Sequence, residues 1–160
     1  MPTALSHREA RLEDLPLICT FPQTAMELYF MYPKATFPLT YEQLKHNFDN
    51  RSDCTVFLSD ENVVAFANMY DIEPGKQCFL GNVIINPAFR GKGVSHYLLE
   101  TMAEIAVQRH QAKELHLTCF NTNTPGLLLY HKTGFIPYAL EKRTDFEGKP
   151  LLAVNMKKNL

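Results

Sequence analysis

The sequence predicts a mixed α/β fold with one central, mostly antiparallel twisted sheet of about six to seven strands, flanked by about four helices. Three apolar runs, at residues 55–59, 62–72 and 78–85, are separated only by short turns, which is typical of an antiparallel meander. A helical stretch then separates the third run from a further apolar run at 114–120, and a strand–helix–strand unit of this kind normally makes a parallel pair. A turn flanked by two more apolar runs, within residues 137–157, completes the pattern.

The composition is that of one globular domain, which we expect to span residues 1–160. The chain is 46% apolar and 21% charged, with a formal net charge of −1. This balance offers no concentrated basic face for nucleic acid, no run approaches the roughly 20 apolar residues of a membrane span, and the first residues lack the apolar centre of a signal peptide. The four cysteines are widely spaced, which is typical of reduced thiols in a cytoplasmic protein, and no metal site is expected.

The first third of the chain is expected to hold one strand and several short helices. Residues 5–10 read as a strand, and Glu13-Asp14 suits the positive end of a helix that follows. Residues 23–30 and 41–48 are predicted helices, the second one capped by Thr40. Aromatic residues are frequent between residues 21 and 50, and they either wall a substrate pocket or pack these helices onto the sheet.

The later elements follow from periodicity and turn residues. From Val94 onward, apolar residues recur every three to four positions, which predicts a long helix with one apolar face. Pro125 is well placed near the start of a shorter helix that Gly134 ends. The strands at 137–146 and 150–157 flank a Glu-Gly-Lys turn.

The segment 90–95, Arg-Gly-Lys-Gly-Val-Ser, lies where a strand and a turn lead into the long helix. Free N–H groups at the helix start, glycines and two cationic side chains together favour an anion, phosphate above all. The segment matches neither a Walker A loop nor the full dinucleotide fingerprint, whose third glycine position holds His96. It fits the pattern Arg/Gln-x-x-Gly-x-Gly/Ala, with Ser95 at the last place, and so resembles the acetyl-CoA pyrophosphate loop of the GCN5-related N-acetyltransferases, the GNAT superfamily.

A second stretch strengthens the resemblance. Residues 123–135 are similar to the superfamily pattern Asn-x-x-Ala-x-x-Leu-Tyr-x-Lys-x-Gly-Phe, with Gly126 in the place of Ala. Both motifs occur in the expected order, and the order of predicted elements agrees over nearly the whole chain. The resemblance implies a GNAT-like fold whose parallel strands, at 78–85 and 114–120, part to form an acetyl-CoA cleft. It also implies acetyl-CoA as the acetyl donor, and a homodimer is common among related proteins.

The resemblance implies direct transfer of acetyl from acetyl-CoA to a primary amine of a small molecule or peptide. A backbone N–H between Val83 and Ile85 would stabilise the oxyanion of the transition state, and Tyr130 would protonate the departing thiolate. Glu73 is the predicted general base, with His116 or water molecules as alternatives, and Glu27 and Tyr29 are the predicted substrate-binding residues. The residues expected to bind the cofactor are Val83, Ile85, Arg90, Gly91, Lys92, Gly93, Val94, Ser95, Asn123 and Tyr130.

Two other functions remain open at the level of sequence. A non-catalytic acyl-CoA-binding regulatory module would keep the same loop, and the strand at 78–85 carries no carboxylate that could act as base. A nucleotide-binding α/β protein could also use a basic glycine loop at a helix start. Binding of acetyl-CoA, ATP or NAD distinguishes these functions.

Overall fold

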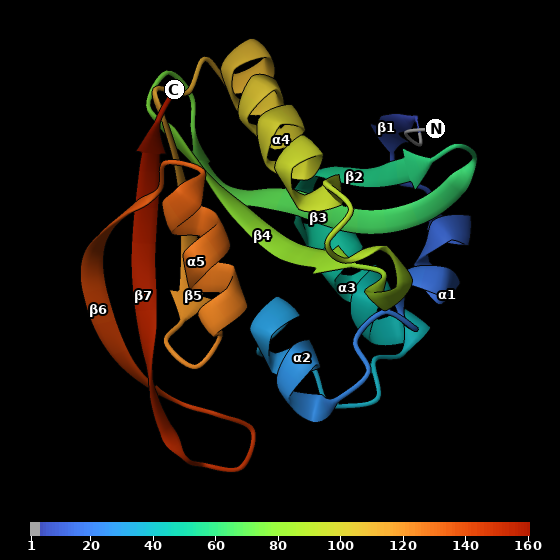
Figure 1. Cartoon of the computed structure of the whole chain (residues 1–160), viewed down its shortest axis with the longest axis horizontal. Helices are drawn as coiled ribbons and strands as arrows, with labels where there is room; N and C mark the ends of the chain where they lie inside the picture. The colour runs from blue at the N-terminus through green and yellow to red at the C-terminus, as the bar shows by residue number, and fades with distance from the viewer. Residues whose placement is uncertain (1–3) are drawn as a thin grey trace.

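The structure, a computed structural model, describes residues 4–160 and is built on a single seven-stranded sheet (Figure 1). The strands lie in the order β1-β2-β3-β4-β5-β7-β6. Their bounds are β1 Leu5–Glu9, β2 Ser52–Ser59, β3 Asn62–Glu73, β4 Gln77–Ile85, β5 Glu114–Phe120, β6 Ile136–Thr144 and β7 Pro150–Asn159. The helices are α1 Leu15–Ile18, α2 Ala25–Met31, α3 Tyr41–Asn50, α4 Val94–His110 and α5 Thr124–Lys132, with short 3-10 turns at Leu12–Asp14 and Pro87–Phe89. The predicted fold class is confirmed.

All neighbouring strands are antiparallel except one pair. Strands β2, β3 and β4 form the expected meander, and β6 and β7 form the expected hairpin. The long helix α4 connects β4 to β5, which run parallel as the strand–helix–strand pattern predicts. Strand β5 is therefore held by a parallel neighbour on one side and by antiparallel β7 on the other.

Two helical layers cover the sheet (Figure 1). The apolar face of α4, with Leu98 and Met102 fully buried, packs on alternate residues of β3 such as Ala67 and Met69. The intervening side chain Phe66 points to the other face, where it packs with Leu44 of α3 and with residues of α1 and α2. Helix α5 lies over β5 on the same side as α4, and α2 lies below β4 and beside the lower end of α5 in this view (Figure 1).

Side-chain caps define the starts of three helices. Thr24 accepts a hydrogen bond from Glu27 N at the start of α2, Thr40 from Gln43 N at the start of α3, and Asn123 from Gly126 N at the start of α5. Thr40 was predicted as a cap. Each of these caps satisfies one backbone N–H that the helix itself leaves without a partner.

Strand β2 begins three residues earlier than the sequence predicts. Asp53, at a φ of 53°, interrupts the pairing of β2 with β3. Its buried carboxylate accepts from Arg109 Nη1 at 2.8 Å and lies 2.7 Å from His110 Nε2, and both partners come from the last turn of α4. The early start of β2 therefore depends on a helix more than 50 residues away, which local sequence does not reveal.

Neither a membrane span nor a metal cluster is found in the described part of the chain. No helix within residues 4–160 is long and apolar enough to cross a membrane. The same residues contain no group of three or more His, Cys, Asp or Glu side chains that could hold a metal ion.

Candidate active site

The parallel strands β4 and β5 separate shortly after they meet. Their pairing is limited to three positions, which end at Phe79 opposite His116. Beyond that point β4 continues to Ile85 and β5 continues to Phe120, with no ladder between them. The facing backbone groups of β4 from Leu80 onward are therefore available to a ligand lying between the strands, as expected of a cofactor cleft.

A β-bulge lies on β4 beside this opening. The register with β3 shifts between the pairs Asn68–Gly81 and Phe66–Ile84, so Asn82 and Val83 together face one residue of β3. Asn82 has a φ of 52°, in the left-handed region, and its Nδ2 donates to the Met31 carbonyl of α2 at 2.9 Å. The bulge turns local backbone N–H groups away from the ladder, which is the arrangement that an oxyanion site requires.

The N-terminus of α4 differs from the starts of α2, α3 and α5. Its N-cap is Gly93, which has no side chain to cap the helix, and the first turn carries no acidic residue. The first N–H groups of α4 and the positive end of its dipole are therefore free to bind an anion.

The glycines of the loop are needed for backbone conformation. Gly91 and Gly93 have φ values of 73° and 82°, which residues with a β-carbon rarely adopt. A β-carbon at either position would meet no atom within 4 Å, so the space above the loop is open. Residues 90–93 are all exposed, as an external phosphate group requires.

The two cations of the loop are held differently. Arg90 Nη2 donates to Glu27 Oε1 of α2 at 2.5 Å, and the second oxygen of Glu27 accepts from Gln23 N. Lys92 forms no ion pair with a described residue, and its Nζ lies 5.2 Å from the centroid of the Phe89 ring. The structure thus places Glu27, predicted as a substrate-binding residue, against the anion loop.

Tyr130 of α5 lies half-buried on the α4 side of the sheet. Its ring packs edge-on against Phe135, with centroids 5.7 Å apart. Burial, with a smaller contribution from Cys119 of β5, raises the pKa of Tyr130 well above its usual range. With its pKa raised, the Tyr130 hydroxyl stays protonated and can donate to a ligand.

Asn123 lies at the start of α5, in the same motif. Its Oδ1 caps the helix by accepting from Gly126 N at 3.1 Å. A β-carbon at Gly126 would lie 2.6 Å from Asn123 Nδ2, so Gly126 leaves room for the amide to fold over the helix. Asn123 therefore caps α5 through its Oδ1, and the N–H groups of its Nδ2 are available to a ligand.

The predicted base Glu73 and its alternative His116 lie at the end of the sheet where β4 is still paired with β5. Glu73 pairs with Gln77 in the β3–β4 hairpin and forms an ion pair with Lys76. Val83 lies six positions after Gln77 on β4, or about 20 Å away at about 3.3 Å per residue. The structure does not bring Glu73 together with Tyr130 or with the bulge.

His116 is also committed to other partners. Its Nδ1 lies 2.8 Å from the Tyr138 hydroxyl, and its Nε2 lies 3.0 Å from Glu114 Oε1. It is only 5% exposed, and both ring nitrogens are occupied. These contacts hold β5 to β6 and leave no nitrogen for proton transfer with a substrate.

Tyr29 has a packing role. It is buried, its ring lies 4.8 Å from that of Phe120, and its hydroxyl donates to the Thr144 carbonyl at 2.7 Å. This contact joins α2 to the β6–β7 hairpin across the far side of the sheet. Tyr29 therefore packs α2 against β5 and the β6–β7 hairpin, and its hydroxyl is already occupied.

Sequence reasoning missed a polar cluster on the face of β4 that points away from α4. The guanidinium of Arg51, just after α3, lies 3.9 Å above the centre of the Tyr70 ring, and its Nη1 is 3.5 Å from Asn68 Oδ1. Both Arg51 and Tyr70 occupy the space that a side chain at Gly81 would fill. The one signal in the sequence was Gly81 itself, since a glycine inside a strand marks a close approach.

Comparisons with known proteins agree with this geometry. The family model described as "Acetyltransferase (GNAT) family" matches residues 18–135. A solved structure named as a candidate phosphinothricin N-acetyltransferase is 25% identical, covers 98% of this chain and 99% of its own, and superposes with a TM-score of 0.80. No curated protein matches the chain at a significant level.

Two further solved structures share the fold. The spermidine N-acetyltransferase from Vibrio cholerae, in complex with CoA and spermine, is 18% identical, with 97% of this chain and 95% of that chain covered and a TM-score of 0.80. The ribosomal-protein-alanine N-acetyltransferase from Brucella melitensis is 22% identical, with 97% and 99% covered and a TM-score of 0.78.

Proposed function

Because this chain belongs to the acetyltransferase (GNAT) family, we propose that it transfers acetyl from acetyl-CoA directly to a primary amine of a small molecule or peptide. The family assigns an acyltransferase that uses acetyl-CoA as its donor. The acceptor and the residues that handle it are our proposal, and they rest on the cleft described above.

The cofactor is proposed to lie between β4 and β5 with its pyrophosphate at the start of α4. The backbone N–H groups of Gly91, Gly93, Val94 and Ser95 would bind the phosphate oxygens, with Arg90 and Lys92 supplying positive charge. The pantetheine arm would run along Val83 and Ile85 of β4, with Asn123 Nδ2 on the opposite side. The observation that carries this proposal is the uncapped, glycine-entered N-terminus of α4 beside an opened parallel strand pair.

The reaction is a nucleophilic substitution at the thioester carbon. The neutral amine nitrogen forms a bond to the carbonyl carbon, whose oxygen becomes an oxyanion near the β4 bulge at Asn82 and Val83. Collapse of the tetrahedral intermediate breaks the C–S bond and releases CoA thiolate. One proton leaves the amine nitrogen and one is delivered to sulfur, so the products are an amide and CoA thiol.

Tyr130 is proposed as the acid that meets the departing sulfur. Its raised pKa keeps the hydroxyl protonated at neutral pH, so a donor is present in every cofactor complex. A hydrogen bond from this hydroxyl stabilises negative charge that develops only as the C–S bond breaks, which favours the transition state over the ground state.

Ordered water is the proposed route for the amine proton. Glu73, the base predicted from sequence, lies at the hairpin end of β4, and both nitrogens of His116 are already occupied. Replacement of Glu73 by Gln tests this choice, because an unchanged profile of kcat/KM against pH supports water, whereas loss of activity together with the low-pH limb of the profile would restore Glu73 as the base.

Assembly and location are also proposals. Strand β6 is an edge of the sheet with exposed apolar side chains, Ile136 at 68% and Leu140 at 64%, which suits pairing with a second copy. Light scattering on the purified protein measures this, and a monomer at all concentrations would reject the homodimer. The four free cysteines favour a reducing, cytoplasmic location, which cell fractionation checks.

A ligand panel is the direct test of the donor site. Thermal unfolding is measured with acetyl-CoA, CoA, ATP and NAD in parallel, because a ligand that binds only the folded state raises the unfolding temperature. We expect a rise with acetyl-CoA and CoA alone, followed by amine-dependent release of CoA thiol. Binding without release by any amine would support the non-catalytic module, and a shift only with ATP or NAD would contradict the proposal.

A further inference from the structure

The guanidinium of Arg51 is unusual among the arginines of this chain. Four arginines are paired with carboxylates, and Arg11 is exposed to solvent; the four paired ones are Arg8, Arg90, Arg109 and Arg143. Arg51 is partly buried, yet no described carboxylate lies within ion-pairing distance of it. A partly buried charge without a hydrogen-bonded counter-ion is costly, and a ligand of opposite charge would offset that cost.

The surroundings of Arg51 leave most of its donors unused. Its one polar contact within residues 4–160 is the long bond from Nη1 to Asn68 Oδ1, at 3.5 Å. The Tyr70 ring supports its flat side, which fixes the orientation of the guanidinium without using its N–H groups. Burial lowers the pKa of Arg51, and Asp71 opposes this only through its charge, with no hydrogen bond. The planar guanidinium of Arg51, whose N–H groups form a fork of donors, is thus held in place. This fork is still able to bind an oxyanion.

The position of the fork relates it to the proposed reaction. A β-carbon at Gly81 would collide with Arg51 Nη1 and lie 2.9 Å from Tyr70 Cε1, so both groups lie directly over this residue. Gly81 follows the end of β4–β5 pairing by two residues and comes immediately before the bulge at Asn82. One or two residues of strand correspond to about 3–7 Å, so the fork lies close to the expected thioester carbonyl.

The guanidinium of Arg51 lies on the face of β4 opposite α4 and α5. Helices α4 and α5 cover one face of β4 and β5 (Figure 1). Strand alternation places Tyr70 and Thr118 on the other face, with Arg51 over the Tyr70 ring. The Tyr70 hydroxyl reaches Thr118 across β4, and Thr118 Oγ1 donates to Asn155 Oδ1 at 2.8 Å. An acceptor that approaches β4 from this face would meet a polar surface in which no described carboxylate is hydrogen-bonded to Arg51.

We propose that Arg51, supported by Tyr70 over Gly81, binds a carboxylate or similar oxyanion of the acceptor, which is therefore an α-amino-acid-like amine. This inference rests on the proposed acetyltransferase function and narrows its substrate class. A single carbon separates the amine of an α-amino acid from its carboxylate, which matches the short distance between Gly81 and the bulge. A polyamine would instead place a second positive charge against Arg51, which is unfavourable.

The test compares amines that differ only by the carboxylate. The pairs are L-phenylalanine and phenethylamine, L-methionine and 3-(methylthio)propylamine, L-lysine and cadaverine, and L-alanine and ethylamine. Release of CoA thiol is measured at equal concentrations of neutral amine. We expect the amino acid of at least one pair to have a kcat/KM about ten- to a hundred-fold above that of its decarboxylated partner, as a hydrogen-bonded charge pair provides.

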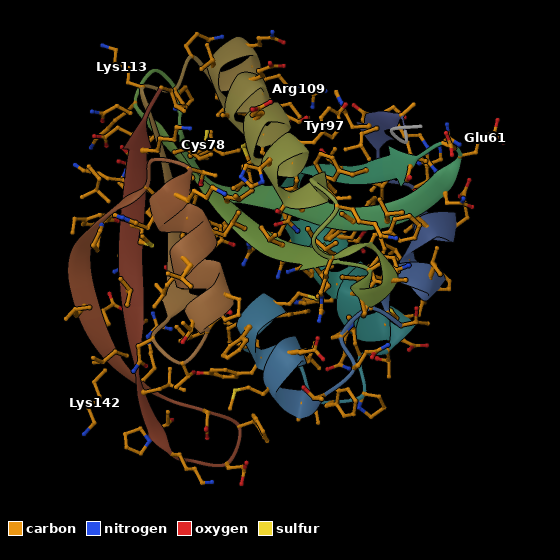
Figure 2. All side chains as sticks on the ribbon, viewed as in Figure 1. Glu61, Cys78, Tyr97, Arg109, Lys113 and Lys142 are labelled. Atoms are coloured by element: carbon orange, nitrogen blue, oxygen red, sulfur yellow. The ribbon has the colours of Figure 1, made fainter. Side chains whose placement is uncertain are left out.

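Substitutions then assign the preference to Arg51. Arg51→Met should abolish it by raising KM for the amino acid alone, and Arg51→Lys should restore part of it, because lysine keeps the charge without the planar fork. Lys142→Met makes the same change of charge at an exposed position on β6 (Figure 2), and should leave the preference intact. Acetyl-CoA binding, measured by calorimetry, should be equal in all variants, which also shows that they fold.

The outcomes separate this inference from the proposed function. If acetyl-CoA binds but no amino acid is preferred, or if Arg51→Met affects both members of a pair equally, the inference is wrong and the acetyltransferase proposal stands. Absence of acetyl-CoA binding to the parent protein overturns the proposed function and the inference with it.

Discussion

Replacing Glu27 by Gln should strengthen acetyl-CoA binding. Glu27 holds Arg90 in an ion pair, and the incoming pyrophosphate has to compete with this carboxylate for the same guanidinium. The substitution removes the competing charge and a source of repulsion towards the phosphates, and it keeps the shape of the side chain. Stronger binding on removal of a residue beside the site is a result that simple damage to the site would not produce.

The size of the effect follows from the exposure of the pair. The side chains of Arg90 and Glu27 are 50% and 26% exposed, so solvent screens their attraction, and exposed pairs contribute about 0.2–1 kcal/mol. At about 1.4 kcal/mol per tenfold change, Kd for acetyl-CoA should fall by a factor of about 1.4 to 5 at low salt. The gain should shrink at about 0.5 M salt, because screening weakens both the pair and the repulsion.

Calorimetry with acetyl-CoA at low and high salt measures this difference. Glu61→Gln is the matched control, since Glu61 is an exposed residue of the β2–β3 turn and belongs neither to the loop nor to α2 (Figure 2). It makes the same change in net charge away from the loop. Unchanged or weaker binding by Glu27→Gln at low salt would refute the competition, and an equal gain in Glu61→Gln would attribute the effect to net charge alone.

Three further predictions concern catalysis and stability. Tyr130→Phe should lower kcat by about 10²–10⁴-fold with little change in acetyl-CoA affinity, measured by steady-state kinetics and calorimetry; equal turnover would remove Tyr130 as the acid. Asn82→Ala should be less stable to urea than Asn82→Gly by about 1–2 kcal/mol, because both lose the bond to Met31 O but only Ala carries a β-carbon at a φ of 52°, and equal midpoints would contradict this reasoning. The hydrogen bonds from Arg8 hold the pKa of Asp14 below its value in the unfolded chain, so its stabilisation is present at neutral pH and is lost as the pH falls from about 5 to 2. Asp14→Asn should therefore unfold more easily at pH 7 and show a flatter decline in acid, and a parallel decline would show that Asp14 does not cause the acid sensitivity.

The sequence by itself determined the features that depend only on residues close together along the chain. The strands alternate along their length, α4 shows its apolar period from Val94, and Gly91 and Gly93 mark a loop whose backbone can approach a ligand closely. These properties follow from sterics and periodicity over a few residues, so they can be read without the fold. The motif with Tyr130 was likewise local, and its position on α5 agrees with the prediction.

The tertiary structure alone decided which charged groups meet. Glu27 and Arg90 are 63 residues apart, and Glu27 was predicted to bind substrate because its own helix offers no information about the loop it contacts. Glu73 was a reasonable base in sequence, yet the hairpin pairing places it at the closed end of β4. Arg51 became notable only when packing removed it from water and gave it no carboxylate. Such pairings depend on how the strands align and where the sheet opens, which are properties of the whole chain and of no single segment.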